Sequence, residues 1–407
     1  MERVHLVDSS EKCTGCGACL TICPTKAISM ETDSLGVQYP KINGDACIRC
    51  GKCVRICKSS SCTADRTDRK AYAAKGRSDA LVKKSASGGV FATLANGCTR
   101  EEFLVAGAVM HLEQNKVEVV HVLSDKAEDI HHMQGSKYVQ SDAWRCYGAV
   151  LDAVKNGKYV LFTGTPCQVA AVRKLTGNPE NLITMDLICH GVPPVQMLND
   201  YLRILSKRFG GTVEELNFRD KSCGKQFCAR VGIKRGKNVK DYLVRSRFLS
   251  YYKYFLEGTI YRESCYSCPY ANMDRISDIT IGDFWGIEKY HGKDLEQEGM
   301  TSPKDWSCIL VNTDKGDHFL KRYGSDLYLY SSRPEWIAEN NQQLNAASAR
   351  PQNRSEVLEA YRSGGFQTVE KEFIRKNGGY LRFSYRMARS IYQNRRYTKY
   401  EKLKYED

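Results

Sequence analysis

A chain of 407 residues with 42% hydrophobic content is large enough for roughly two or three globular domains, and no apolar run approaches the roughly 18 residues that span a bilayer. The net charge of +14 is spread along the chain without a helix-turn-helix or zinc-finger pattern, so we expect no nucleic-acid binding. A solvated basic surface is the favoured interpretation, and attraction of anionic partners such as phosphate-bearing cofactors or acidic redox proteins is the alternative. The first residues, MERVHLVDSS, lack the apolar core of a signal peptide, so we expect a cytoplasmic protein in which the 18 cysteines indicate metal or redox chemistry rather than disulfides.

Two cysteine ladders dominate residues 1–60, which we predict to be a small domain. The stretches CTGCGACLTIC and CIRCGKCVRIC share the spacing C-x2-C-x2-C-x3-C, and the segment resembles a bacterial-type two-cluster ferredoxin. In that pattern the fourth cysteine of each ladder serves the other cluster. Zinc is the less favoured alternative, because it usually takes two CxxC pairs separated by a longer loop. The spacing therefore predicts two [4Fe-4S] clusters, one on Cys13, Cys16, Cys19 and Cys57, the other on Cys47, Cys50, Cys53 and Cys23.

A polar stretch over residues 61–84, which contains Cys62, is rich in Ser and charge, and we predict a linker there. Ser87, Gly88 and Gly89 then precede a helical run, so backbone amides at this helix start can receive a phosphate or pyrophosphate. Taken alone, an ordinary capped helix explains the same residues better.

Two later apolar strands each end beside a cysteine. Cys167 follows the strand Tyr159–Thr163 at a helix start, and Cys189 with His190 follows NLITMDLI. Neighbouring strands of an α/β sheet would present both sulfurs at one carboxyl-end edge. Either Cys167 is a nucleophile with His190 as its base, or both cysteines bind metal. The CxxC pair Cys265 and Cys268 favours a site of four thiolates, for a [4Fe-4S] cluster or for zinc.

Several motifs stand in order between residues 85 and 330: SASGGVF, GSKYVQSD, TGTPCQVAAVR, CHGVPP, CYSCPYANMDRISDITIGDFWG and CILVNTDKG. Together they resemble the beta subunit family of coenzyme F-420 hydrogenases and dehydrogenases. The resemblance implies a larger α/β domain with an N-terminal part at 85–155 and a C-terminal part at 156–330, which carries FAD and an adjacent [4Fe-4S] cluster. It implies cluster ligands at Cys167, Cys189, Cys265 and Cys268, and flavin contacts at Ser87, Gly88, Gly89 and Lys137.

Other residues are weaker candidates. Asp283 and Trp285, at the end of a predicted strand, would contact flavin or substrate, with packing an equal alternative. Arg219, Asp220 and Lys221 lie in a polar turn that would bind an anionic substrate, although a solvated loop is the safer interpretation. We interpret the remaining cysteines of the central region as small core residues: Cys98, Cys146, Cys223, Cys228 and Cys308.

Residues 331–407 form a predicted helical, basic tail. Leu381, Tyr385, Ala388 and Tyr392 recur at helical spacing among many Lys and Arg residues. We favour a helix that packs these residues on its own domain with a charged outer face. Peripheral contact with an anionic membrane, or docking of a partner, is the alternative.

These patterns predict an α/β (α+β) iron–sulfur flavoprotein of the oxidoreductase class. Electrons would pass between a carrier such as ferredoxin or an oxidoreductase subunit, the two N-terminal clusters, the third cluster and FAD, which exchanges a hydride with a small molecule. The resemblance implies a deazaflavin such as coenzyme F-420, with another metabolite open, and an oxygen-sensitive, anaerobic setting. The alternatives are an electron-transfer subunit with no substrate of its own, serving a partner enzyme, and a non-redox scaffold.

Overall fold

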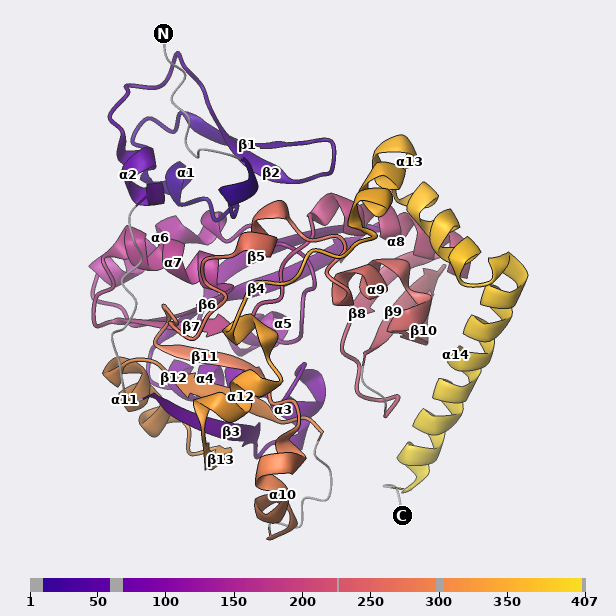
Figure 1. Cartoon of the computed structure of the whole chain (residues 1–407). Coiled ribbons are helices and arrows are strands. Elements are labelled where there is room, and N and C mark those ends of the chain that lie inside the picture. Colours follow the sequence, from indigo (N-terminus) through magenta and orange to yellow (C-terminus); the bar gives the residue numbers. More distant parts are fainter. Residues whose placement is uncertain (1–9, 59–68, 225–226, 298–303, 405–407) are drawn as a thin grey trace.

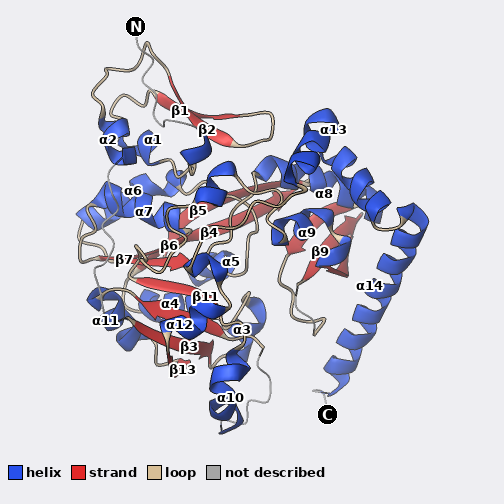
Figure 2. Ribbon diagram, viewed as in Figure 1, coloured by secondary structure: helices blue, strands red, loops and turns tan. Residues whose placement is uncertain are grey.

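The computed structural model describes residues 10–58, 69–224, 227–297 and 304–404 (Figure 1). A small N-terminal domain rests on one end of a larger α/β body, and a long C-terminal helix runs down another side (Figures 1 and 2). This arrangement confirms the predicted mixed α/β fold, in which a small domain precedes a larger one.

The N-terminal domain consists of short helices and one hairpin. Its elements are η1 (Ser10–Lys12), α1 (Ala18–Ile22), β1 (Ile28–Thr32), β2 (Gln38–Ile42) and α2 (Lys52–Lys58). Gly17 directly precedes α1 with a φ of 77°, and a Cβ on it would come within 2.3 Å of the Cβ of Trp144 in the body. Glycine is therefore required where the two domains meet.

The body is built on an eight-stranded sheet. In spatial order its strands are β13 (Leu327–Ser332), β3 (Lys70–Gly76), β12 (Ser307–Val311), β11 (Ile279–Asp283), β7 (Leu182–Leu187), β6 (Val160–Gly164), β4 (Leu104–Glu113) and β5 (Lys116–Ser124). Strands β4, β6, β7 and β11 are parallel, and the other pairings are antiparallel. Because helices cover both faces, the parallel strands are continuous apolar runs such as the fully buried Val160, Leu161 and Phe162.

Helices lie on both faces of this sheet (Figure 2). The helices are α4 (Val90–Thr99), α5 (Ala127–Met133) and α11 (Asp314–Tyr323) in one layer, and α6 (Trp144–Lys155) and α7 (Pro166–Thr176) in the other. Leu94 and Phe319 belong to the core under the first layer, and Tyr147 and Val169 to the core under the second. The N-terminal domain sits on the second layer, where α1 contacts α6 and α7.

The structure differs from the predicted linker over residues 61–84. Strand β3 lies inside the sheet between β13 and β12, and α3 (Asp79–Lys84) follows it. Ala71, Ala73 and Ala74 are almost fully buried, so the strand is stabilised by close packing of small side chains that carry little strand signal in a sequence. Cys62 lies outside the described residues.

A second, three-stranded antiparallel sheet stands beside the main one (Figure 1). Its strands are β8 (Thr212–Asn217), β9 (Cys228–Arg235) and β10 (Asn238–Arg245), and it is flanked by α8 (Val195–Phe209), α9 (Ser250–Leu256), α13 (Arg354–Lys376) and α14 (Gly379–Lys404). The remaining elements are η2 (Ser246–Phe248), η3 (Glu263–Ser267), α10 (Ile287–Gln297), α12 (Pro334–Glu339) and η4 (Gln342–Leu344).

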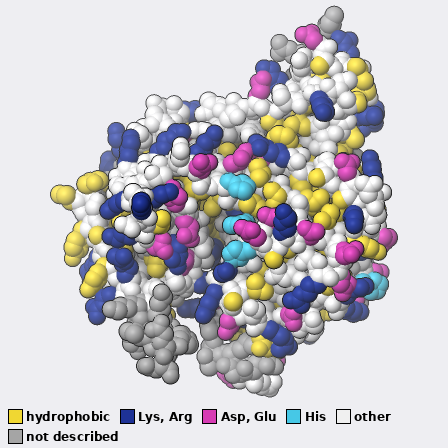
Figure 3. All heavy atoms as spheres, turned by 180° about the vertical axis from the view of Figure 1, so that it is seen from behind, with side chains coloured by type: hydrophobic (Ala, Val, Ile, Leu, Met, Phe, Trp, Pro, Cys, Tyr) yellow, Lys and Arg dark blue, Asp and Glu magenta, His cyan; other side chains and the backbone are white. Residues whose placement is uncertain are grey.

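Helix α14 packs on this second unit, but not through the residues predicted to pack, Leu381, Tyr385, Ala388 and Tyr392. Phe383 and Met387 are buried, whereas Leu381, Tyr385 and Tyr392 are 85%, 67% and 63% exposed. Apolar side chains accordingly line the edge that α14 forms in Figure 3, and elsewhere on that face Lys and Arg are scattered among acidic residues. None of the helices in the described part of the chain is long and apolar enough to cross a membrane.

Candidate iron–sulfur and redox site

The structure brings the twelve predicted cysteine ligands together in three groups. The first group is Cys13, Cys16, Cys19 and Cys57; the second is Cys23, Cys47, Cys50 and Cys53; the third is Cys167, Cys189, Cys265 and Cys268. The first two groups lie in the N-terminal domain and the third in the body. The grouping matches the sets that the spacing and the resemblance predicted, and the role of these cysteines as cluster ligands stays a prediction.

The second group lines one cavity together with Ile28 of β1 and Ile42 of β2. Of the residues that the structure describes, those lining this cavity all belong to the N-terminal domain. Although burial alone would raise it, the pKa of Cys23 is lowered by hydrogen bonds that its sulfur receives, including one of 3.3 Å from the Ala27 amide. Amide donors of this kind also stabilise the sulfurs of iron–sulfur clusters.

The first group lies on the side of the domain that faces the body. Burial, and then the neighbouring sulfurs of the same group, raise the pKa of Cys19 above its ordinary value. Cys16 packs against the core formed by α6 and α7, close to Trp144. The first group is therefore the one nearer to the body.

The third group surrounds a cavity at the carboxyl-end edge of β6 and β7. Cys167 lies in the first turn of α7, Cys189 follows β7, and Cys265 and Cys268 come from η3 and its end. Burial raises the pKa of Cys167 to about 12 and that of Cys265 to about 11. Burial thus disfavours a free thiolate at Cys167, whereas binding of a metal releases the thiol proton.

Each group supplies four cysteine thiols, the donor set that a [4Fe-4S] cluster takes. Among the described residues, no three His, Cys, Asp or Glu side chains form a group that could hold a metal ion. The Ser264 hydroxyl, which lines the third cavity, is buried and has no hydrogen-bond partner in the part of the chain that the structure describes. It is available to donate to a cluster sulfur.

Arg262 fastens the N-terminal domain to the body beside the first and third groups. The residue is 1% exposed, and its guanidinium donates to the Cys13 carbonyl (2.7 Å), to the Gln38 carbonyl (2.7 Å) and to Oε1 of Gln140 (3.0 Å). A Cβ on Gly15 would come within 2.6 Å of this guanidinium, which explains the glycine. The sequence carries no local signal for this residue, because its partners lie more than a hundred positions away.

The three groups follow one another in space. Thr14, which directly follows Cys13, lines the third cavity with that cavity's four cysteines. The charge of Cys16 also contributes, after burial and closer neighbours, to the raised pKa of Cys167. The order is therefore second group, first group, third group, and then the edge of the sheet.

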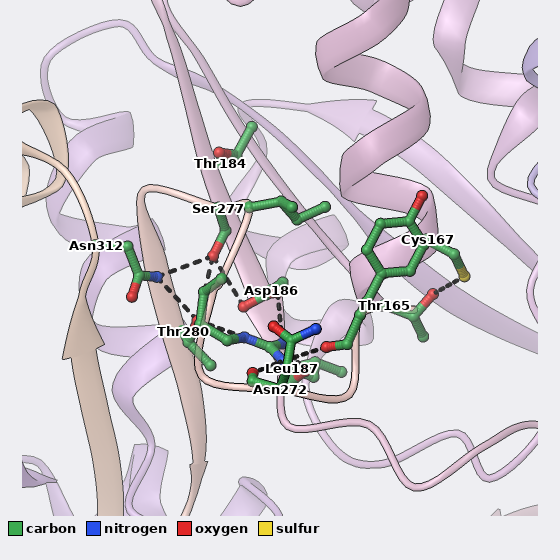
Figure 4. A network of polar contacts seen from close by, with 12 residues as sticks. Thr165, Cys167, Thr184, Asp186, Leu187, Asn272, Ser277, Thr280 and Asn312 are labelled. Carbon is green, nitrogen blue, oxygen red and sulfur yellow. Dashed lines mark hydrogen bonds and ion pairs between the residues drawn. The ribbon is translucent and has the colours of Figure 1, made fainter. Parts of the chain in front are cut away.

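A buried polar network holds the third group's loop against β7 (Figure 4). Arg275 and Asp186 form an ion pair of 2.6 Å with side chains 1% and 0% exposed, and Ser277 donates to the same carboxylate at 2.8 Å. Arg275 also donates to the Tyr270 carbonyl at 2.8 Å and lines the third cavity. The motif DRISDIT, for which the sequence alone predicts no role, supplies most of this network.

Beyond the third group, the sheet edge presents charged and aromatic side chains. Asp283, at the end of β11, forms a bidentate ion pair with Arg219 (3.1 and 3.2 Å), whose guanidinium lies 5.8 Å from the ring of Trp285. His190 is exposed, and Leu187 is 41% exposed. The edge next to Cys189 is therefore open to solvent and to a ligand.

The predicted flavin residues have protein partners in this structure. The Gly88 amide donates to Oγ of Ser307 and the Ser87 hydroxyl to the Trp306 carbonyl, both at 2.9 Å. Gly89 precedes α4 with a φ of 79°. Burial lowers the pKa of Lys137 to about 7, and its ammonium donates to the carbonyls of His132, Met133 and Gln134. In this structure these groups are engaged by protein partners, and their assignment as flavin contacts stays a prediction.

The side chains of the polar turn at residues 219–221 are held by ion pairs and hydrogen bonds within the protein rather than solvated. Asp220 pairs with Arg230 at 2.6 Å, and Lys221 donates to the carbonyls of Val82 and Ser87. The cysteines that we interpreted as core residues are all buried: Cys98, Cys146, Cys223, Cys228 and Cys308.

Comparison with known proteins matches two segments of the chain to family models. Residues 12–61 match the family model of the 4Fe-4S dicluster domain, and residues 157–335 match that of the C terminus of the coenzyme F420 hydrogenase/dehydrogenase beta subunit. An uncharacterized protein of Methanocaldococcus jannaschii is 23% identical over 357 residues, which cover 77% of this chain and 87% of that protein. A chain of the F420-reducing [NiFe] hydrogenase complex from Methanosarcina barkeri aligns with a TM-score of 0.44 and 18% identity, covering 72% of this chain and 92% of that one.

The two matched segments enclose all three cysteine groups. The first matched segment contains the first and second groups, and the second contains the third group. The protein thus combines an N-terminal 4Fe-4S dicluster domain with a C-terminal domain of the coenzyme F420 hydrogenase/dehydrogenase beta subunit family.

Proposed function

We propose that the protein is an iron–sulfur oxidoreductase that carries electrons through three [4Fe-4S] clusters to a redox site at the carboxyl-end edge of β6, β7 and β11. The observation that supports this most strongly is Thr14, which adjoins a ligand of the first group and lines the cavity of the third. Two cysteine groups from different domains, enclosed side by side, suit an electron path better than two separate structural sites.

In this proposal the cysteines hold the clusters, and two arginines position and tune them. Arg262 holds the first group against the third through the Cys13 carbonyl. Arg275 places a buried positive charge beside the third cavity. A thiolate-bound cluster gains negative charge on reduction, so a nearby cation stabilises its reduced form and raises its potential.

The site that follows the third cluster is, by the family resemblance, that of FAD. A flavin, when bound, links one-electron clusters to two-electron substrates. The partly exposed Trp285 and the exposed His190 are the residues we expect nearest to it, and Arg219, held by Asp283, offers a positive charge to its phosphates or to an anionic substrate. A deazaflavin such as coenzyme F-420 is the substrate class that the resemblance favours.

One observation favours a second function, that of an electron-transfer subunit with no substrate of its own. Ser87, Gly88 and Lys137, predicted to bind flavin, direct their polar groups to protein partners instead. Such a protein would pass electrons through its clusters to a partner enzyme.

The flavin content of anaerobically purified protein, followed by a turnover test, separates the two functions. The protein is reduced with one equivalent of dithionite per cluster and mixed with coenzyme F-420 in the absence of any partner. The oxidoreductase proposal predicts one bound FAD per chain and loss of the F-420 absorbance. A protein that lacks flavin, yet has its clusters and reduces no diffusible acceptor, would be the electron-transfer subunit.

A further inference from the structure

The second cysteine group marks the outer end of the proposed relay. The described residues that line its cavity all belong to the N-terminal domain, whereas the first group faces the body. In Figure 1 this domain extends beyond the sheet and helices of the body. An external carrier would therefore exchange electrons with the second group.

The surface at this cavity has an apolar centre. Ile48 lies between Cys47 and Cys50 in the sequence, is 63% exposed and lines the cavity beside them. Exposed Pro24 lies on the same lining. A single exposed aliphatic side chain is ordinary on a protein surface; what distinguishes Ile48 is its position on the lining of the cavity that holds the second cysteine group.

Positive charge surrounds this apolar centre. Arg49 and Lys52 line the cavity, and among the described residues its lining includes no acidic side chain. Arg55 belongs to the same surface, since a Cβ on the lining residue Gly51 would lie 3.2 Å from its guanidinium. Lys26 is exposed three positions after Cys23. The acid nearest to Ile48 in the sequence is the exposed Asp45, and the acid nearest to Lys26 is the exposed Glu31.

We propose that this surface, made up of Lys26, Ile48, Arg49, Lys52 and Arg55, docks an acidic protein that carries single electrons. The inference rests on the proposed relay and names its partner. Complementary charge steers a carrier to the cavity, and the apolar centre allows its redox centre to approach closely. In each encounter one electron leaves the reduced carrier and enters the oxidised cluster; no bond forms or breaks and no proton moves.

The alternative basic surface does not meet these conditions. The exposed face of α14 carries Arg382 and Arg389 around Tyr385, but all three cysteine groups lie in other elements. A carrier bound there would be separated from the second group by the body of the protein. This face therefore provides a matched control for total charge.

The test is stopped-flow reduction of the full-length, cluster-loaded protein by a pre-reduced acidic 2[4Fe-4S] ferredoxin. We expect the second-order rate constant to fall about tenfold as salt rises from about 0.05 to about 0.5 M. The double reversal Lys52→Glu with Arg55→Glu should lower the low-salt rate about tenfold, whereas Arg382→Glu with Arg389→Glu, equal in charge, should leave it within about twofold. Ile48→Asp should lower the rate at high salt as well, because it removes the apolar contact.

The proposed docking surface would be overturned if the second-order rate constant fell equally in the two double variants, or if it did not depend on the salt concentration. Iron content and bleaching by excess dithionite are measured on every variant, so that a lost cluster is not mistaken for lost docking. If wild-type protein holds all its clusters but docks elsewhere, the relay survives and only this inference fails. If wild-type protein lacks a cluster on the second group, the relay and the inference fail together.

Discussion

Arg262 donates a 2.7 Å hydrogen bond to the carbonyl oxygen of Cys13, and so ties the ladder that begins the chain to the loop that carries Cys265. The same guanidinium lies 4.7 Å from the ring centroid of Tyr39. One buried side chain thus joins two domains at the point where two cysteine groups meet. The first prediction concerns this contact.

Arg262→Gln should loosen the N-terminal domain. It leaves the carbonyls of Cys13 and Gln38 without their charged donor, which we expect to lower the free energy of unfolding by about 3 kcal/mol. Chemical denaturation of the anaerobic protein measures this loss. Arg262→Lys, which keeps the charge but not the three-way geometry, should recover part of it.

The matched control is Arg350→Gln. Arg350 pairs with Glu263 nearby, but its side chain is 55% exposed, so this change should cost less than about 1 kcal/mol. Electron paramagnetic resonance of the reduced protein gives a second readout, because magnetic coupling between the first and third clusters depends on how the domains are held. Unchanged coupling in Arg262→Gln would show that this residue does not position the clusters.

The buried pair of Asp186 and Arg275 gives the second prediction. Asp186→Asn leaves a buried guanidinium without its counter-charge and should destabilise the protein by about 3 to 5 kcal/mol. Replacing both residues, as in Asp186→Leu with Arg275→Met, should cost less than the single change, because no charge is left unpaired. Thermal or chemical unfolding of the three proteins tests this order.

The double variant also reports on the third cluster. If it folds, it lacks both charges of the pair but keeps every cysteine, and the Arg275 guanidinium no longer lines the cavity. We expect a lower reduction potential for the third cluster alone, measured by redox titration. Potentials that stay unchanged at all clusters would show that Arg275 has only a structural role.

These arginines mark the limit of what the sequence predicts. Cysteine ligands recur at short spacing, so the ladders and the CxxC pair are visible locally, and strand ends placed Cys167 and Cys189 together. Arg262 and Arg275 act across long sequence separations and show no periodicity. The prediction of the packed face of the C-terminal helix was wrong for another reason. Phe383 and Met387 have the same helical spacing as Leu381 and Tyr385, so periodicity alone does not decide which face packs.

His121 gives a pH-dependent prediction. Burial lowers its pKa from 6.5 to about 4, and its Nε2 is 2.9 Å from the Thr163 carbonyl oxygen. Between pH 6.5 and 4 the unfolded chain binds a proton that the folded protein does not, so stability is constant above this window and falls as the pH drops through it. The loss should approach about 3 kcal/mol at pH 4.

His121→Gln should remove this dependence, because glutamine does not titrate. The comparison is with the exposed His132→Gln, which should keep the wild-type slope. Unfolding free energies measured at pH 7, 5.5 and 4.5 test the difference. Parallel curves for all three proteins would mean that His121 is not held neutral in the folded state.

The central claim is that the protein holds three [4Fe-4S] clusters. The most direct test is the iron and acid-labile sulfide content of anaerobically purified wild-type protein, compared with that of the double variant Cys265→Ala with Cys268→Ala. Three cubane clusters require about twelve irons per chain in wild type, and the variant should retain about eight, held by the two N-terminal groups. About eight irons in both proteins would contradict the claim, because the relay would then end in the N-terminal domain and the third group would hold no cluster.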